Sequence, residues 1–526
     1  MKRDPGVGSG GATRLRATDH HVLMDEQLGL LFDRQSLRVW PVPPDVAGTL
    51  MKVLAEATGL PATSAPARAV DEIIRAYHSA PDTDLLSKIP RAHEDEAEVR
   101  NTVAADRYLG KLAVNVANDC NLGCTYCYAN GGFYGTPERI MLSGDDAEQI
   151  VMRFARKFDY IESVQFMGGE PSMNSSAIAA CGRAFTRLVG NGSLAGMPRF
   201  QLVTNALVLS SAFLDLCERY GIELTVSLDG PARVHDSVRT RKNGRGSYTQ
   251  VRKNVDRALA RKIRIGFEPT FSRAHLDAGF NLIHLCTWFH DEFGIEELHA
   301  PPVSGNRYAD SSLLLTNEEK MRQYCAVAEW GVDNLLIRRR RLLHDFTARI
   351  INDLATRTRN SVICPAGNSQ ISVSVKGELS PCWMYTDDPD FTLGHIDDDD
   401  LISEAGYGTL RRMQQAELHS HPHCRSCMIQ PLCFGCKGAD YHETGTMEGK
   451  SNCDFMRAMV ATTLMRIFSH RDVPQDIDGY LNRTTPGERD YRRLRPEIQD
   501  DALVQGPVGT RRVFLPLTAL GKHFDA

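Results

Sequence analysis

The chain has 526 residues, of which 42% are hydrophobic and 24% are charged, a composition typical of globular proteins of more than one domain. Its 66 acidic and 61 basic residues give a formal net charge of −5, so the charge balance provides no argument for binding nucleic acid. No apolar run reaches the roughly 18 residues that a membrane-spanning helix needs, and we expect no membrane partner.

The N-terminal part of the sequence predicts a small module of strands and helices. Residues 1–18 are polar and Gly-rich, and we expect a flexible tail there. Within residues 20–88, the alternating apolar residues of HVLMDEQLGLLFD and LRVWPV predict two or three short strands, and VAGTLMKVLAEATGL predicts a helix. A second helix is expected over residues 69–87, and the charged residues 89–109 are interpreted as a linker.

Between residues 110 and 350, a pattern of apolar strand, loop and helix repeats. Such alternation predicts an α/β fold of parallel strands joined by crossover helices, either an open sheet or a barrel, with its chemistry in the loops at the carboxyl ends of the strands. A basic run at residues 338–341 lies in an apolar-periodic segment and is interpreted as the solvated face of a helix. Six segments are the candidate strands: KLAVNVAND, SVQFMGGEP, RFQLVTNA, IELTVSLDG, IRIGFEPT and EELHAPPV.

The last part of the sequence changes character. Residues 360–460 are rich in cysteine, proline and glycine and lack a continuous apolar pattern, so we expect metal sites to stabilise this section. A helix is predicted over FMRAMVATTLMRIF. The C-terminal extension, residues 461–526, contains an apolar VFLPLTAL segment whose role the sequence does not show.

Cysteine is the most informative residue type, with 14 copies. The start of the sequence has no apolar run typical of a secretion signal, so we expect a cytoplasmic protein with reduced thiols. Clustered cysteines then indicate metal binding or catalysis rather than disulfides. Four cysteines stand alone in apolar surroundings and are expected to be buried structural thiols: Cys181, Cys217, Cys286 and Cys325.

The segment CNLGCTYCY, residues 120–128, places Cys120, Cys124 and Cys127 in one short loop. Three thiolates can hold three irons of a cubane [4Fe-4S] cluster and leave the fourth iron open to a substrate. A structural zinc ion would need a fourth ligand nearby, and the first histidine downstream is His235. A disulfide is disfavoured where thiols stay reduced. The spacing therefore favours an iron-sulfur cluster and makes the three cysteines metal-binding and catalytic candidates.

This Cys-X3-Cys-X2-Cys spacing resembles the signature of the radical S-adenosylmethionine (SAM) superfamily, and further motifs follow in the order of that family. Tyr126 stands where the family often places an aromatic residue beside the adenine, and GGEP resembles a loop whose carboxylate meets the SAM ammonium. Arg239 and Arg241 resemble a clamp for the SAM carboxylate, and we take Arg239 as the candidate. The resemblance implies these SAM-binding residues: Tyr126, Gly168, Gly169, Glu170, Pro171, Thr204, Asn205, Ser227, Asp229 and Arg239.

The resemblance also implies a fold and a reaction. Residues 110–350 would form a partial (β/α)6 TIM-type barrel, and the protein would be an oxidoreductase. SAM would chelate the open iron, and one electron from the reduced cluster would split SAM into methionine and a 5′-deoxyadenosyl radical that removes an unactivated hydrogen atom. The implied electron donor is reduced flavodoxin or ferredoxin.

Seven later cysteines resemble the SPASM extension of that superfamily, which holds two auxiliary [4Fe-4S] clusters. The family usually places three residues between the last close pair, whereas this sequence has two. A zinc ribbon built from four of the seven is the alternative. Only three cysteines reach the inner cluster, so our hypothesis is an open iron or a non-cysteine ligand there, able to bind a substrate thiolate. The implied inner set is Cys364, Cys382 and Cys436, and the outer set is Cys424, Cys427, Cys433 and Cys453.

The N-terminal module resembles the winged-helix peptide-binding element that is similar to the chaperone of the pyrroloquinoline quinone pathway. Three strands and a helix could take up a leader peptide by strand addition at a sheet edge, which would make the substrate a ribosomal precursor peptide or small protein. A structural cap on the barrel is the alternative. Trp383 stands where sulfatase-maturing relatives often carry an aspartate base, which counts against that activity.

The whole arrangement resembles thioether-forming maturases, including those for cysteine-rich peptides and for the small subunit of quinohemoprotein amine dehydrogenases. We therefore expect an enzyme that installs Cys sulfur-to-carbon crosslinks. Carbon-carbon crosslinking, epimerisation, and oxidation of a Cys or Ser are alternatives with the same radical. A non-catalytic iron-sulfur or zinc protein that binds a peptide is the alternative from another class.

Overall fold

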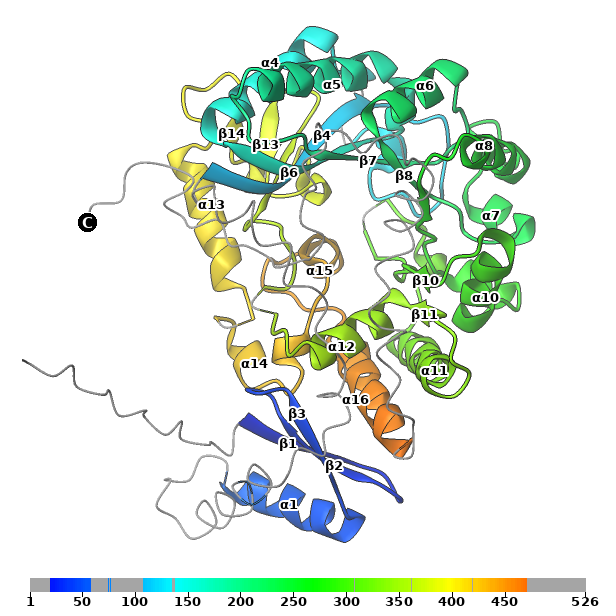
Figure 1. Cartoon of the computed structure of the whole chain (residues 1–526), viewed down its shortest axis with the longest axis vertical. Helices are drawn as coiled ribbons and strands as arrows, with labels where there is room; N and C mark the ends of the chain where they lie inside the picture. Colours follow the sequence, from blue (N-terminus) through cyan, green and yellow to red (C-terminus); the bar gives the residue numbers. More distant parts are fainter. Residues whose placement is uncertain are drawn as a thin grey trace, which may run out of the picture.

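The computed structural model describes residues 19–57, 74, 76, 107–134, 138–306, 308–360, 362–418 and 420–470. These residues form an open ring of strands and helices, with a small sheet and one helix attached at one side (Figure 1). Within the described part of the chain, no helix is both long and apolar enough to cross a membrane.

A large mixed sheet forms the centre of the fold, and five of its strands are strands predicted from the sequence. They are parallel and lie in the order β4-β6-β7-β8-β9, with their helices on the outside of the ring (Figure 1). The predicted α/β class is therefore confirmed, as a partial TIM-type barrel that does not close. The strands are β4 (Tyr108–Asn118), β6 (Tyr160–Gly168), β7 (Arg199–Thr204), β8 (Glu223–Val226) and β9 (Ile265–Phe267).

The sixth predicted strand lies outside this sheet. β10 (Glu297–Leu298) has only two residues and pairs in parallel with β11 (Leu343–His344) in a separate sheet. The prediction of a sixth strand in the same sheet is therefore wrong, because Pro301 and Pro302, separated from β10 by two residues, cannot donate to a ladder. A short antiparallel strand, β5 (Ile140–Met141), pairs with the carboxyl end of β4.

The helices around the sheet begin and end where local chemistry predicts. Ser143 caps α4 by accepting a hydrogen bond from Asp146 N, and α6 ends at Gly221 in the left-handed conformation. Thr316 and Glu319 form a capping box at the start of α11. The helices are α4 (Gly144–Lys157), α5 (Ser175–Gly190), α6 (Ser211–Tyr220), α7 (Ala232–Val238), α8 (Tyr248–Ala260), α9 (Arg273–Asp277), α10 (Leu282–Phe293), α11 (Asn317–Leu336) and α12 (Asp345–Ala355).

The basic run does not lie on a helix. α11 ends at Leu336, and residues 338–341 form the loop before β11, with Arg339 at φ +53°. Arg341 pairs with Glu297 at 2.7 Å, while Arg338 donates to Asn334. The interpretation as a solvated helix face is therefore wrong in its secondary structure, although residues 338–340 are exposed.

The cysteine-rich section extends the central sheet. β12 (Gln370–Val373) pairs in parallel with β4, and β13 (Glu378–Ser380) and β14 (Gly394–His395) continue the sheet in antiparallel order. This section thus forms one side of the open ring, where α13 and the strands β13 and β14 lie in Figure 1. Its helices are α13 (Glu404–Gln415), α14 (Pro422–Arg425), α15 (Lys437–Thr444) and α16 (Cys453–Ser469).

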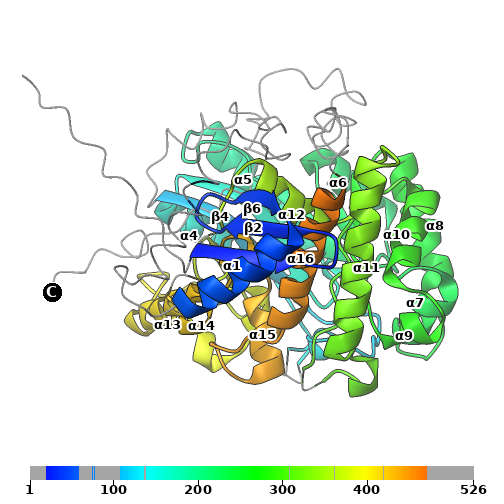
Figure 2. The same ribbon diagram turned by 90° about the horizontal axis from the view of Figure 1, so that it is seen from below.

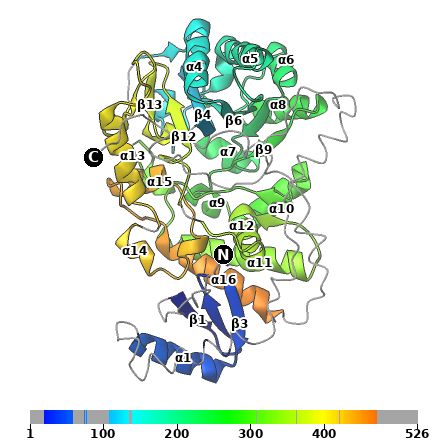
Figure 3. The same cartoon turned by 60° about the vertical axis from the view of Figure 1, so that its left-hand side comes forward.

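The N-terminal module has the three strands and the helix that the sequence predicts. β1 (His20–Met24), β2 (Gly29–Asp33) and β3 (Arg38–Val42) form an antiparallel sheet, and α1 (Pro44–Ala57) follows. One face of the sheet packs beneath α1 and the other joins the core of the ring, beside α16 (Figures 2 and 3). The second predicted helix, most of the predicted linker, and the chain after residue 470 lie outside the described residues.

Candidate active site

The three early cysteines lie in the loop that directly follows β4. The loop is held against the segment after α7, because Gly123 N donates to Thr240 O at 2.8 Å and Thr125 N donates to Val238 O at 3.0 Å. Cys120, Cys124 and Cys127 are close enough to influence each other electrostatically. The structure thus brings together the three thiols that the spacing selected.

Several donors point at these sulfur atoms. Leu122 N lies 3.4 Å from Cys120 Sγ, Gly131 N lies 3.3 Å from Cys127 Sγ, and the Asn205 amide lies 3.5 Å from Cys120 Sγ. Burial raises the pKa of Cys120 to about 12 and that of Cys124 to about 11, so both thiols are protonated without a metal. Iron binding would deprotonate them, and N–H donors stabilise the resulting thiolates.

The glycines of the GGEP motif allow the second loop to approach the cysteine loop closely. A β-carbon at Gly169 would clash with the Asp119 carbonyl and with Gly132. Gly168 has φ +143°, and a β-carbon there would clash with the Ala117 carbonyl. These glycines therefore position the two loops against each other.

Glu170 is buried and bonded within the protein. Its carboxylate accepts hydrogen bonds from Ser172 N at 3.0 Å, Thr204 Oγ1 at 2.7 Å and Asn205 N at 2.7 Å. Burial raises the pKa of Glu170 above its ordinary value. Glu170 therefore joins the ends of β6 and β7 and orients Asn205 toward Cys120. Pro171 follows at the first position of a short 3-10 helix, and Ser227 N donates to Thr204 O at 2.8 Å.

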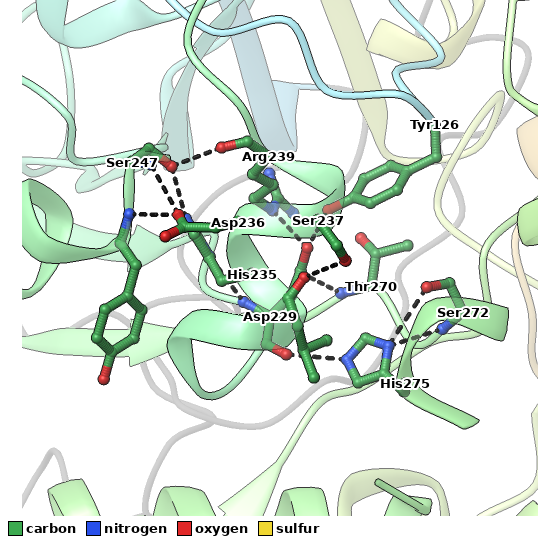
Figure 4. Close-up of polar contacts among 12 residues, drawn as sticks. Tyr126, Asp229, His235, Asp236, Ser237, Arg239, Ser247, Thr270, Ser272 and His275 are labelled. Atoms are coloured by element: carbon green, nitrogen blue, oxygen red, sulfur yellow. Dashed lines mark hydrogen bonds and ion pairs between the residues drawn. The ribbon is translucent and has the colours of Figure 1, made fainter. Parts of the chain in front are cut away.

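Asp229, at the end of β8, is the centre of a buried network (Figure 4). Its carboxylate accepts hydrogen bonds from Tyr126 Oη, from Arg239 Nε at 2.9 Å and from Thr270 N at 2.9 Å. Burial opposes the charged form, but the Arg239 guanidinium holds the pKa of Asp229 below its ordinary value. Arg239 also lies 5.1 Å from the Tyr126 ring centre and donates to Cys124. Of the two candidate arginines, Arg239 therefore faces the cysteines, and Arg241 bonds Gly246 O at the surface.

Two buried histidines support the backbone around Asp229 (Figure 4). His235 Nδ1 accepts from Asp229 N at 3.3 Å, and His275 Nε2 lies 2.9 Å from Asp229 O. Burial lowers the pKa of His235 to about 4, so it is neutral and can accept that hydrogen bond. No motif in the sequence indicated a role for either histidine, because both make their contacts only in the folded loop.

The inner face of the barrel carries polar groups that the sequence analysis missed. Leu112 and Val114 of β4 face the outer core, so alternation places Lys111 on the inner face, where it donates to Gln165 at 3.1 Å. Lys111 Nζ lies 5.5 Å from the Trp383 ring centre and interacts electrostatically with Cys382 and Glu268. In the sequence, the one feature that could have indicated this polar group is the single lysine at the start of the apolar segment KLAVNVAND.

His299 follows β10 directly and lies near Glu268, which follows β9. Its Nδ1 lies 2.6 Å from Asp345 Oδ2, and its Nε2 lies 4.0 Å from Glu268 Oε1. Burial opposes the charged imidazolium, but Asp345 and then Glu268 raise the pKa of His299 to about 9. His299 is 44% exposed, so this charged donor is accessible to a bound molecule.

The seven later cysteines lie in two neighbouring groups. Cys382 lies close enough to Cys436 and Cys364 for electrostatic interaction, and Ala439 N donates to Cys436 Sγ at the start of α15. Cys433 interacts in the same way with the three remaining thiols, and those four line one cavity, which Cys436 borders as well. We call these the inner and outer cysteine groups: Cys364, Cys382 and Cys436, and Cys424, Cys427, Cys433 and Cys453.

The inner group is held by a buried ion pair that the sequence analysis also missed. Glu417 accepts from Ile363 N at 2.9 Å and from Asn368 Nδ2 at 2.8 Å, and it pairs with Lys437. Glu417 therefore joins the segments that carry Cys364 and Cys436. All 14 cysteines are free thiols, and three of the four isolated ones are buried as predicted, while Cys325 is half-buried.

The early cysteines fit a cluster better than a single metal ion. Among the described residues, no three Cys, His, Asp or Glu side chains are preformed around a single ion. A cubane binds each thiolate through a different iron, so its ligands stand farther apart than the four ligands of one zinc ion. Buried and half-buried thiols that neighbour one another, with N–H donors on Cys120 and Cys127, fit such a cluster.

Comparison with known proteins places the central domain. The model of the radical SAM superfamily matches residues 114–281. Residues 114–281 are a radical SAM domain. Such a domain implies a [4Fe-4S] cluster and SAM, and the protein is an enzyme.

Relatives extend over more of the chain. The radical SAM cyclopropyl synthase TigE of Paramaledivibacter caminithermalis is 23% identical over 399 residues, which cover 72% of this chain and 79% of that protein. The mitochondrial GTP 3′,8-cyclase of Arabidopsis thaliana is 23% identical over 41% of this chain and 52% of its own length. The solved structure of anSMEcpe with bound AdoMet covers 71% of this chain and 98% of its own, with a TM-score of 0.59 and 14% identity, and so supports the fold.

We predict that Arg239→Ala destabilises the barrel, because it leaves the buried Asp229 carboxylate without its cation. Removing one partner of a buried pair costs about 3–5 kcal/mol, to be measured as the free energy of unfolding by urea with a probe in the barrel. The matched control Arg241→Ala should change it by less than about 0.5 kcal/mol. Equal effects of the two substitutions would contradict the buried pair.

We also predict that Asp345→Asn lowers the pKa of His299, which can be measured by NMR of labelled histidine. The variant removes the negative charge that offsets the effect of burial on the imidazolium. In the wild type, the folded pKa lies above the ordinary 6.5, so the charged contact stabilises the fold fully below about pH 6.5 and is lost as pH rises through about 9. Glu268→Gln, the control, should lower the pKa less, since 4.0 Å separates the groups. An unchanged His299 pKa in Asp345→Asn would show that Asp345 does not stabilise the charged imidazolium.

Proposed function

We propose that the protein is a radical SAM maturase that installs Cys thioether crosslinks in a ribosomal precursor peptide or small protein. The observation that carries this proposal is that one side chain, Tyr128, lies close to both the early cysteines and the inner cysteine group. Tyr128 interacts electrostatically with Cys127 of the early group and with Cys382 of the inner group, and Lys111 interacts with Cys382 from β4. A substrate bound beside Tyr128 would therefore be near both groups.

The early cysteines would hold the cluster that binds SAM, and the loops after β6, β7 and β8 would hold SAM. When bound, this pair supplies a 5′-deoxyadenosyl radical. The chain's own part is to orient the substrate and to exclude water from a reactive radical. The residues proposed to contact SAM are Tyr126, Gly168, Gly169, Glu170, Pro171, Thr204, Asn205, Ser227, Asp229 and Arg239.

The inner cysteine group is proposed as a second [4Fe-4S] site with three protein thiolates. A cubane with three thiolates keeps one iron for another ligand, and a substrate thiolate fits that role. Trp383, rather than an aspartate, follows Cys382 and packs over Lys111, which argues against a sulfatase-type oxidation. The outer cysteine group would complete a third cluster, with reduced flavodoxin or ferredoxin as the electron donor.

Similar proteins support a peptide substrate and leave a second reaction open. anSMEcpe has been solved with AdoMet and the Kp18Cys peptide, at a TM-score of 0.57 and 15% identity. TigE, which matches 72% of this chain, is a cyclopropyl synthase. The second candidate is therefore carbon-carbon bond formation by the same radical.

The N-terminal module is proposed to bind the leader of the precursor by strand addition. Both faces of its sheet are buried, so β1 and β3 are the edges that remain to pair with a peptide. A structural cap would need no such edge. The proposed division of the chain is a leader-binding module at 20–88, the barrel at 110–350 and the auxiliary-cluster section at 360–460.

Iron content tests the proposed clusters. Anaerobically reconstituted wild type should hold about twelve irons, and a variant with Cys120, Cys124 and Cys127 changed to Ala should hold about eight, because one cubane is lost. A wild-type content of about four irons, with zinc in the remainder, would overturn the auxiliary clusters and leave the radical SAM domain.

Mass spectrometry tests the reaction. Cys-containing peptides encoded beside the gene are incubated anaerobically with the reconstituted enzyme, SAM and a reductant, and their mass and free thiols are measured. Thioether formation should remove two hydrogens and one thiol per crosslink. Loss of two hydrogens with every thiol retained would favour carbon-carbon bond formation, and an enzyme without Cys120, Cys124 and Cys127 is the control.

A further inference from the structure

We propose that Arg34 of the N-terminal sheet positions the loop that carries Cys424 and Cys427, so that the N-terminal module is a structural part of the outer cysteine group. The inference rests on the proposed function only where it concerns iron, because the conformation of the loop can be measured without a cluster. It adds a role for the module that peptide binding does not require.

The contact is made by a buried guanidinium. Arg34 lies in the turn between β2 and β3 and is only 9% exposed. Its NH1 group donates to Arg425 O at 2.5 Å and to Cys427 O at 3.4 Å. Two backbone carbonyls of the outer cysteine loop are thus bonded to one side chain from a segment almost 400 positions earlier in the chain.

The guanidinium is fixed from its own side as well. Its Nε and NH2 groups each lie 3.1 Å from Asp19 Oδ1, and Arg34 N donates to Asp19 O at 2.9 Å. Asp33 holds the same turn by accepting from Gln35 N and Ser36 Oγ. With its charge neutralised by Asp19 and its backbone held, Arg34 presents its free donors to the loop in one orientation.

The loop that Arg34 contacts is a short run of tight turns. α14 has four residues, and its last residue, Arg425, is one of those that Arg34 bonds. Within the loop, Cys427 N donates to Cys424 O at 3.1 Å and Gln430 N donates to Cys427 O at 3.1 Å. Arg34 adds a bond from a distant segment to this local structure. Cys424 lies inside the helix and Cys427 two residues after it, so the guanidinium holds the backbone beside both thiols.

The rest of the module supports the same contact. One face of its sheet, including Leu30, Phe32 and Val39, belongs to the same core as Phe455 and Met459 of α16, the helix that begins at Cys453. The module therefore touches the segments of three outer thiols. By linkage, any ligand that shifts the turn between β2 and β3 changes the outer group, and the reverse holds equally.

The test measures the reaction of each thiol with iodoacetamide in metal-free protein under anaerobic conditions, by peptide mass spectrometry. In Arg34→Ala, Cys424 and Cys427 should react about tenfold faster than in the wild type, the change expected when a charged hydrogen bond to the loop is lost. After reconstitution, the same variant should hold about four irons fewer than the wild type. Arg34→Lys, which keeps the charge without the planar fork, should lie between the two.

Arg357→Ala is the matched control, because Arg357 bonds Leu37 O at the other end of the same turn. Its thiol rates should stay within about twofold of the wild type, as should the rate of buried Cys181 in every variant. If the alkylation of Cys181 is also faster in Arg34→Ala, that variant has lost its fold. The alkylation rates of Cys424 and Cys427 in Arg34→Lys then test the proposal. Unchanged rates at Cys424 and Cys427 with Arg34 removed, or equal acceleration in Arg357→Ala, would overturn the proposal. Changed rates with unchanged iron would show that Arg34 positions the loop but is not needed for the outer cysteines to hold iron.

Discussion

The buried carboxylate of Asp229 is the group on which the geometry of the candidate active site depends. Moving a carboxylate out of water costs several kcal/mol, and Arg239 offsets that cost only if it is held beside Asp229. The same carboxylate accepts hydrogen bonds from Tyr126 of the cysteine loop and from Thr270 after β9. Three segments that are distant in sequence are therefore fixed by one charge, and Arg239 extends the network to Cys124.

Around this charge, the parallel sheet places the remaining loops at one edge. Gly169 allows the loop after β6 to pack on the backbone of Asp119, and Glu170 then reaches Asn205, whose amide points at Cys120. The cysteine loop is thus supported from β6, β7 and β8 together. His299, paired with Asp345, and Lys111, bonded to Gln165, add polar groups after β10 and on β4 that the motifs after the strands do not include.

The sequence predicted the elements whose signal is local. Strand periodicity and the polar motifs after each strand located β4, β6, β7, β8 and β9 and the loops of the site. β10 was misjudged because EELHAPPV has strand character but pairs over only two residues. The basic run at 338–341 was predicted to be helical because no Pro or Gly interrupts the apolar period around it. In the fold, α11 ends at Leu336, before this run. Contacts such as Arg34 with the Cys427 carbonyl, or Glu417 with Lys437, join distant segments and carry no local signal.

If the early cysteine loop, supported by Asp229 and Arg239, holds the cluster that binds SAM, the reduced enzyme must cleave SAM. The decisive measurement is 5′-deoxyadenosine formation, by liquid chromatography and mass spectrometry, in anaerobically reconstituted enzyme with SAM and dithionite. Wild type should form 5′-deoxyadenosine, and Cys124→Ala should form none above the background without enzyme. Cleavage that persists in Cys124→Ala, or wild type that carries its cluster but forms no 5′-deoxyadenosine, would contradict the account.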